Sequence, residues 1–434
     1  MSQRNQSPTQ SSQKGSEHVG TLCELEITNV AHGGVFVARH EGRVIFVADT
    51  LPGERVIARI SDASQKSFWR ADTVEVLKSS PDRQEHIWSA ASLHRDPAER
   101  AGGAEFGHIR LAAQRDLKSF VLEDSLQRMA RLEREVTVES LPGDDESKGT
   151  GWRTRVRLHI DGDGRVGPYA ARSHTVIPVD SLPLATARVN EIAPLTQRMP
   201  GSDFVDLIDP SADRARQIVG QYDEGPKKKR PAPEPITEKV GERSFAVDAR
   251  GFWQVHRHAA ATLSQAVSSM IDEALFDPRA ANHDLYGGVG LLAAAVGDRF
   301  GATTRITTVE SDEQATEYAA ENLVDWVGAR ALTARVDRYL ASIERELNAV
   351  ERARYEAATI VLDPPRAGAG REVVRSLAQL HPAQLVYVAC DPVALARDVA
   401  LLADSGYELR ELRAFDLFPN THHVEAVARF VPTR

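Results

Sequence analysis

The sequence predicts an α/β protein with a mostly parallel sheet in its C-terminal half and two further parts before it. From about residue 259 onward, short β-rich runs alternate with helices, which is typical of a parallel sheet covered by helices on both faces. Residues 21–78 instead alternate apolar and polar positions between turn dipeptides such as Gly33-Gly34, and this period of two predicts a small antiparallel β-barrel. The stretch between them combines a helical pattern with short strands, so we expect a small α+β unit there.

These patterns divide the chain into four segments. The first residues are polar and contain no apolar core, which indicates a disordered tail rather than a secretory signal. A stretch rich in proline and charge is expected to be a loop or linker, and the KKKR run inside it is more often a solvated charge run than a phosphate contact. The predicted segments are a tail at 1–19, an OB-like barrel at 20–80, a central α+β region at 81–240 that ends in the linker at 221–239, and the α/β domain at 241–434.

Composition excludes some classes of protein. The chain has 434 residues, of which 42% are hydrophobic, and no apolar run approaches the roughly 18 residues that span a bilayer, so we expect a cytoplasmic protein without a membrane partner. Cys23 and Cys390 are the two cysteines, and both are expected to be free thiols in a reducing compartment. The net charge of -9 argues mildly against a general nucleic-acid binder, although a local patch can supply phosphate contacts.

A glycine-rich loop marks a candidate cofactor site. DLYGGVG at 284–290 ends a predicted strand and opens a helix, so its glycines let the backbone approach a ligand at the helix N-terminus. Glu310 ends the next strand, where a carboxylate can accept two ribose hydroxyls. Both features also suit a nicotinamide dinucleotide, and the glycines alone could make a tight turn. The Asp-Pro-Pro triplet at 363–365 favours a methyltransferase loop that frames a cofactor and a planar base, with a proline-stiffened turn as the alternative.

Cys390 and Glu425 are the candidate catalytic residues. Cys390 follows the strand LVYVA, so it lies at a carboxyl strand end, where open α/β sheets carry active groups; most free cysteines are instead inert core residues. Carbon 5 of uracil is a poor nucleophile until a thiolate adds to carbon 6, and a base must later remove the carbon-5 proton. Glu425 begins the last apolar strand and is the best candidate base, with an exposed polar side chain as the alternative.

With these residues in view, the chain resembles the cytoplasmic RNA 5-methyluridine methyltransferases that carry an N-terminal TRAM barrel. The resemblance covers nearly everything from residue 20 to the end and rests on five motifs in the family's order: GFWQVH (251–256), DLYGGVG (284–290), LDPPRAG (362–368), VACDPVALARD (388–398) and DLFPNTHHVE (416–425). It implies a Rossmann-like class I methyltransferase domain that uses S-adenosylmethionine and acts on ribosomal or transfer RNA as a monomer.

Carried over position by position, the resemblance assigns roles to single residues. It implies that Cys390 is the nucleophile and Glu425 the proton acceptor. It also implies contacts to S-adenosylmethionine, with Asp337 as a further neighbour of the adenine; the contacting residues are Gln254, Tyr286, Glu310 and Asp363. The pair Arg397-Asp398 is expected to lie on a helix surface and receives no catalytic role.

The chain departs from the family where many members hold an iron-sulfur cluster. The Cys-Gly-Gly-Cys of those members is replaced by Ala101 to Ala104, and Leu182 stands where a further cysteine precedes a proline. Without thiolates no such cluster can be bound, so we expect no metal and predict apolar packing in this region. Smaller departures include Gly287 for cysteine and Asp391 for asparagine, whose negative charge is expected to raise the pKa of the neighbouring thiol.

Three functions remain open from sequence. The leading hypothesis is an enzyme that methylates carbon 5 of a uridine in ribosomal or transfer RNA. A second is a non-catalytic RNA-binding or folding factor that retains the fold, favoured by the lost cluster cysteines and the acidic charge. A third is a methyltransferase that acts on a small molecule, in which case the barrel would be idle.

Overall fold

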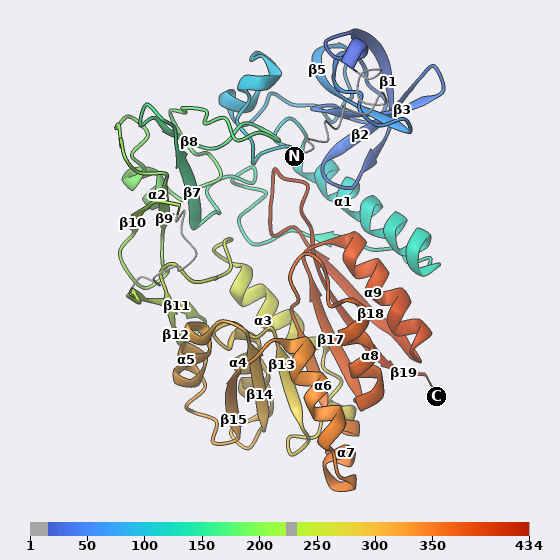
Figure 1. Cartoon of the computed structure of the whole chain (residues 1–434), viewed down its shortest axis with the longest axis vertical. Coiled ribbons are helices and arrows are strands. Elements are labelled where there is room, and N and C mark those ends of the chain that lie inside the picture. Colours follow the sequence, from blue (N-terminus) through green and yellow to red (C-terminus); the bar gives the residue numbers. More distant parts are fainter. Residues whose placement is uncertain (1–15, 223–231, 434) are drawn as a thin grey trace, which may run out of the picture.

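The computed structural model describes residues 16–222 and 232–433. Most of the predicted tail and the KKKR run at 227–230 therefore lie outside the described residues. Figure 1 shows three parts: a barrel, a central region beside it, and a larger C-terminal domain below both. In the part of the chain that is described, no helix is long and apolar enough to cross a bilayer.

The N-terminal part is a closed five-stranded barrel, as predicted. It follows a short 3-10 turn, η1 (Ser16–His18), and its strands pair in the order β1, β2, β3, β5, β4. Alternate residues point inward, so Leu25, Phe36 and Ile45 are fully buried in the barrel core. This inward alternation is the physical basis of the period of two in the sequence. The strands are β1 (Leu22–Ala31), β2 (Val35–His40), β3 (Arg43–Ala48), β4 (Arg55–Asp62) and β5 (Phe68–Lys78).

The central region is a four-stranded antiparallel sheet with a few helices. The sheet order is β10, β9, β7, β8, with β7 (Arg155–Ile160), β8 (Val166–Gly167), β9 (Phe204–Ile208) and β10 (Arg216–Gly220). Its long helix α1 lies between the barrel and the C-terminal domain (Figure 1). The helical elements are η2 (Ser89–Ala91), η3 (Pro97–Glu99), α1 (Leu111–Ser125), η4 (Leu126–Ala130) and α2 (Ala187–Ile192).

The C-terminal domain is an eight-stranded, largely parallel sheet. Its order is β15 (Ala329–Thr333), β14 (Ile306–Glu310), β13 (Asn282–Leu285), β16 (Thr359–Leu362), β17 (Gln384–Ala389), β19 (Glu425–Pro432), β18 (Tyr407–Phe415) and β6 (Val138–Glu139). The strands from β15 to β17 are parallel, and β19 runs antiparallel to both of its neighbours.

Helices cover both faces of this sheet, as predicted. On β17, Leu385 and Tyr387 pack into one apolar cluster while Val386 and Val388 pack into the other, so both faces are buried. Two buried faces explain the continuous apolar runs of these strands. The helical elements are α3 (Ala259–Met270), η5 (Glu273–Leu275), α4 (Leu291–Phe300), α5 (Glu313–Asn322), α6 (Val336–Glu346), α7 (Ala349–Glu356), α8 (Gly370–Leu380) and α9 (Pro392–Asp404).

Two segments of the central region join the C-terminal domain. The short strand β6 pairs in parallel with β18 and forms the edge of the sheet. The hairpin of β11 (Pro235–Val240) and β12 (Arg243–Asp248) sends Ile236 and Phe245 into the core of the large domain. The domain border proposed at 240/241 therefore falls in the turn of this hairpin.

Candidate active site

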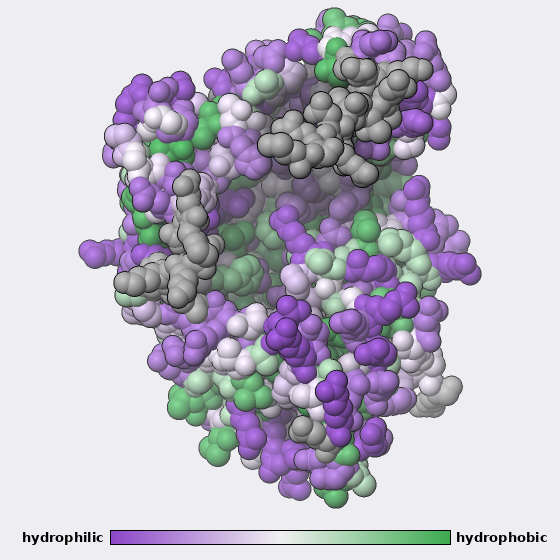
Figure 2. Space-filling model, viewed as in Figure 1, coloured by the Kyte–Doolittle hydropathy of each residue, from purple (hydrophilic) through white to green (hydrophobic). Residues whose placement is uncertain are grey.

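Four of the predicted residues follow neighbouring strands at one edge of the sheet. Glu310 ends β14, and Tyr286, Asp363 and Cys390 directly follow β13, β16 and β17. These strands are parallel neighbours in the order β14, β13, β16, β17, so their carboxyl ends meet at the same edge. The space-filling view in Figure 2 shows this face of the molecule hollowed where the three parts meet.

Glu425 reaches the same edge because β19 runs in the opposite direction. Ala389 of β17 pairs with Ala426 of β19, so the next positions along the two strands, Cys390 and Glu425, lie opposite each other. In antiparallel strands such directly opposed residues lie within a few ångströms of each other. The negative charge of Glu425 accordingly raises the pKa of Cys390. The structure thus brings the predicted nucleophile and the predicted base together.

Cys390 is half-buried, and its surroundings favour the neutral thiol. Burial raises the pKa of Cys390 to about 12, and the charges of Glu425 and Asp363 add to this effect. The guanidinium of Arg366 acts in the opposite direction. The raised pKa of this thiol is therefore attributed to burial and these two acids, and Asp391 is not among its causes.

The two carboxyl groups beside the thiol are also held toward their neutral forms. Glu425 is 4% exposed, and burial, followed by the charge of Asp363, raises its pKa well above the usual value. Burial raises the pKa of Asp363 to about 7. The three groups therefore hold fewer than three negative charges near neutral pH.

The glycine-rich loop has the conformation that a close ligand contact needs. Tyr286 has a φ of 63°, and Gly288 and Gly290 have φ values of 52° and 87°. A Cβ at Gly287 would overlap Oγ1 of Thr308, so no side chain fits there without a shift. These features make the tight turn that leads from β13 into α4, with the N–H groups of Tyr286 and Gly287 both bonded to the carbonyl of Val309.

Several polar groups around this loop are available for a ligand. Among the described residues, none donates a hydrogen bond to the carboxylate of Asp363, and the hydroxyl of Tyr286 and the amide of Gln254 have no partner either. Glu310 accepts a 3.2 Å hydrogen bond from the backbone N–H of Gly288, which ties its carboxylate to the loop. Unpaired polar groups at strand ends fit a polar cofactor such as S-adenosylmethionine.

Gln254 and Asp337, the other predicted contacts to the cofactor, do not lie at the strand ends. Gln254 is half-buried in the segment between β12 and α3, next to the buried Trp253. Asp337 begins α6 and forms a 2.8 Å ion pair with Arg335. Burial raises the pKa of Tyr286 to about 12, and the charge of Asp337 contributes, which places this acid near the loop.

Sequence patterns missed two residues that shape the site. Arg366, exposed behind the Asp-Pro-Pro triplet, is the cation that opposes the raised pKa of both Cys390 and Glu425. Asp398 was expected on a helix surface, but its side chain is fully buried and accepts hydrogen bonds from Tyr387 Oη (2.7 Å) and Ala369 N (2.7 Å). The expectation for Asp398 was wrong because α9 turns this position toward the 366–370 loop.

Helix α1 holds the 416–424 loop that leads into Glu425. Lys118, fully buried, forms a 2.5 Å ion pair with Asp416 and donates a 3.1 Å hydrogen bond to the carbonyl of Phe418. Gln114 accepts a 2.8 Å hydrogen bond from Asn420 N and donates one to its side-chain oxygen. These contacts link the start of β19 to the central region, and no sequence pattern predicted them.

The region that replaces the cluster cysteines is packed with apolar side chains. Ala101, Ala104 and Leu182 are buried in one apolar cluster with Trp152. Gly102 lies against the backbone of Tyr169 and Ala171, where a Cβ would come within 3.2 Å. Apolar packing thus fills this region, as the sequence predicted.

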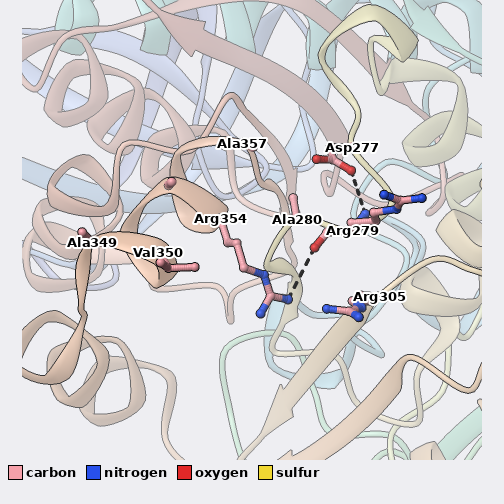
Figure 3. A pocket seen from close by; sticks show the side chains of 9 residues that line it. Asp277, Arg279, Ala280, Arg305, Ala349, Val350, Arg354 and Ala357 are labelled. Atoms are coloured by element: carbon pink, nitrogen blue, oxygen red, sulfur yellow. Dashed lines mark hydrogen bonds between the residues drawn. The ribbon is translucent and has the colours of Figure 1, made fainter.

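A second hollow lies away from the predicted residues, beside the amino ends of β13 and β14 (Figure 3). It has a volume of about 600 Å³ and is lined by residues of α7, among them Arg354, and by Arg279 and Arg305. None of the predicted catalytic or cofactor residues lines it. The predicted residues around Cys390 instead lie at the carboxyl ends of the strands, on the opposite side of the sheet.

Together, the parallel sheet with a reversed strand, the glycine-rich loop and the paired thiol and carboxyl group define an S-adenosylmethionine-dependent methyltransferase domain joined to a barrel. Residues 268–430 match the tRNA (Uracil-5-)-methyltransferase family and residues 17–68 match the TRAM domain. The chain therefore belongs to the tRNA uracil-5-methyltransferase family of RNA methyltransferases.

Individual relatives agree with this assignment. An uncharacterized RNA methyltransferase of Streptomyces coelicolor is 38% identical, with 95% of this chain and 93% of that protein covered. One from Bifidobacterium longum is 33% identical, with 94% and 96% covered. In fold, the chain is similar to the crystal structure of Pyrococcus abyssi tRNA (uracil-54, C5)-methyltransferase in complex with S-adenosyl-L-homocysteine, with a TM-score of 0.65, 21% identity, and 94% and 100% of the chains covered.

Proposed function

We propose that this enzyme methylates carbon 5 of a uridine in ribosomal or transfer RNA through a covalent bond from Cys390. The observation that carries the proposal is the pairing of Ala389 with Ala426, because it sets Cys390 and Glu425 opposite each other at the next position along the two strands. One nucleophile and one base at that spacing suit a planar ring between them.

In the proposed reaction, the Cys390 thiolate adds to carbon 6 of the uracil, and the electron pair of the 5,6 double bond becomes available at carbon 5. S-adenosylmethionine, when bound, supplies an electrophilic methyl group for that carbon. Glu425 then takes the carbon-5 proton, the double bond forms again, and the thiolate leaves carbon 6. Proton transfer to Glu425 requires its carboxylate form.

Two opposing effects set the charge of Cys390 and Glu425 in the free enzyme. Burial holds Cys390 and Glu425 toward their neutral forms, which keeps the free enzyme from accumulating negative charge. The cation of Arg366 favours the charged forms that the reaction needs. We propose that Asp363, whose pKa is raised to about 7, contacts the cofactor and shares protons with these groups.

We propose that the cofactor lies along the loop after β13. The residues that would hold it are Gln254, Tyr286, Glu310 and Asp363, with Asp337 beside them. The side-chain polar groups of Gln254, Tyr286 and Asp363 have no partner within residues 16–222 and 232–433, and this supports the placement.

We propose that the TRAM barrel contacts RNA backbone while the methyltransferase domain takes an unpaired or flipped uridine, because the target carbon is covered in stacked RNA. The related Pyrococcus abyssi protein is named for uracil 54 of tRNA, which makes transfer RNA one of the two substrates to test. A monomer in the cytoplasm fits this role.

Nucleoside mapping by mass spectrometry tests the proposal. RNA from cells that lack this protein should miss one 5-methyluridine, and the purified enzyme with S-adenosylmethionine should restore it. Cys390→Ala should abolish both methylation and covalent capture of RNA. Full methylation by this variant would overturn the covalent mechanism, and stoichiometric RNA binding without methyl transfer by the wild type would favour a folding factor.

Glu425→Gln separates the two catalytic roles. Without a base, the carbon-5 proton stays in place, so a methylated RNA adduct on Cys390 should accumulate and be visible as a protein band of higher mass. Glu408→Gln, at a partly exposed position of β18, is the matched control and should turn over normally. Free methylated product at the wild-type rate from Glu425→Gln would exclude Glu425 as the base.

A further inference from the structure

A small cavity in front of Cys390 is enclosed by all three parts of the chain. Its volume is about 110 Å³, which is far below the roughly 300 Å³ of ordinary ligand pockets and leaves room for one small planar group. The barrel contributes residues 30–34, which we call the barrel turn. The central region contributes Phe106 and Lys118, and the methyltransferase domain contributes Arg366, Cys390 to Pro392, His422 and His423.

The barrel turn contacts the nucleophile loop directly. His32 Nε2 lies 2.8 Å from Oδ2 of Asp391, the residue after Cys390. The other carboxylate oxygen of Asp391 accepts a 2.8 Å hydrogen bond from Ala394 N and so caps helix α9. Asp391 therefore joins the barrel to the helix that begins beside the nucleophile.

The same turn contacts the loop that leads to Glu425. A Cβ on Gly34, which has a φ of +73°, would lie 2.8 Å from Cβ of His422, so only glycine allows this approach. His422 is itself 3.7 Å from the carboxylate of Glu105 in the central region. One short turn of the barrel thus contacts the loops that carry both catalytic residues.

We propose that His32 is a positioning residue that holds Asp391, and through it the loop that carries Cys390, in the orientation that attack on the target base needs. This inference rests on the proposed function and adds to it a role of the barrel in the chemical step, beyond contact with RNA backbone. Because all three parts of the chain enclose the cavity beside Cys390, the barrel turn is part of the wall of the site.

The charges around the contact support the role of His32. The hydrogen bond to Asp391 raises the pKa of His32, and burial opposes it. Burial would raise the pKa of Asp391, but the hydrogen bonds from His32 and Ala394 hold it below its usual value. The other titratable groups that face the cavity are Lys118 of α1, Arg366 of the 363–370 loop, the thiol of Cys390, and the imidazoles of His422 and His423.

The effect of the His32–Asp391 contact should depend on pH with a definite sign. Because the pKa of His32 is raised in the folded protein, its charged contact with Asp391 is fully present below the ordinary histidine pKa of 6.5 and is lost as pH rises through the raised value. The advantage of wild type over His32→Ala should therefore shrink with rising pH. Asp391→Asn keeps an acceptor for the α9 cap but removes the charge, so it should remove this pH dependence.

The test uses full-length enzyme and total RNA from cells that lack it. His32→Ala should lower kcat for methylation about five- to tenfold at pH 6, the size expected for a lost charge-assisted hydrogen bond, while KM for RNA changes less than about twofold. His40→Ala is the matched control, because it lies at the far end of β2 on the same barrel.

Each outcome decides the proposal. Equal kcat values for His32→Ala and His40→Ala would overturn it, and so would a change in KM alone, since His32 would then contact RNA without positioning the nucleophile. A kcat deficit that does not change with pH in His32→Ala would also refute the charged contact. If wild type transfers no methyl group to this RNA, the proposed function fails instead, so the two failures are distinguishable.

Discussion

Removal of the buried ammonium group of Lys118 should destabilise the protein and loosen the loop before Glu425. The side chains of Lys118 and Asp416 are 0% and 1% exposed, and the second carboxylate oxygen of Asp416 has no hydrogen-bond partner among the described residues. Lys118→Met would leave this buried carboxylate without its cation. Breaking one partner of such a pair costs about 3–5 kcal/mol.

The pH dependence of this penalty follows from the same geometry. In Lys118→Met the negative charge of Asp416 would stay buried without the compensating cation. A buried uncompensated charge costs folding free energy only where carboxyl groups ionise, so the penalty is small at low pH and grows as pH rises. The penalty should therefore be larger at pH 8 than at pH 5.

Urea unfolding followed by circular dichroism measures the penalty, provided that the variants unfold with equal m values. Lys118→Met with Asp416→Asn should recover part of the lost stability, since no charge is then left buried. Arg128→Met, which removes an exposed pair with Asp124 on the same helical segment, is the control and should cost no more than about 0.5 kcal/mol. A loss below about 1 kcal/mol for Lys118→Met at pH 8 would refute the reasoning.

Three further predictions concern the site. The rate at which iodoacetamide alkylates Cys390, measured against Cys390→Ala as the blank, should be low at pH 8 and increase steadily to pH 10, because burial raises the pKa of this thiol to about 12. A rate that reaches a plateau near pH 8 would contradict this. Gly287→Ala should weaken S-adenosylmethionine binding in calorimetry and cost about 1–3 kcal/mol of stability, because its Cβ would overlap Thr308 Oγ1 and lie 2.7 Å from Asp284 Oδ2. Thr308→Ala in the same chain should restore binding in part, and unchanged affinity in the single variant would disprove the clash. Asp398→Asn should lower the free energy of unfolding in urea by about 1–3 kcal/mol, because it weakens the hydrogen bonds from Tyr387 and Ala369. The control Asp404→Asn, at the end of the same helix, should leave stability unchanged. Equal stabilities of the two variants would show that Asp398 does not hold the 366–370 loop.

Local patterns in the sequence were sufficient for the fold class and for most of the candidate site. The alternation in residues 21–78 specified the barrel because a strand places every second side chain on one face. The motifs around Tyr286, Asp363 and Cys390 pointed to a common edge because parallel strands end on the same side of a sheet. Each of these inferences depends only on residues close to one another in the chain.

The tertiary structure alone decided which distant segments meet. Strand β19, the last in the chain, lies inside the sheet between β17 and β18, and the edge is formed by β6 from the central region. That order sets Glu425 beside Cys390, and the barrel turn brings His32 to Asp391 across 359 residues. Such contacts depend on the packing of whole layers, and the local sequence of neither partner encodes them.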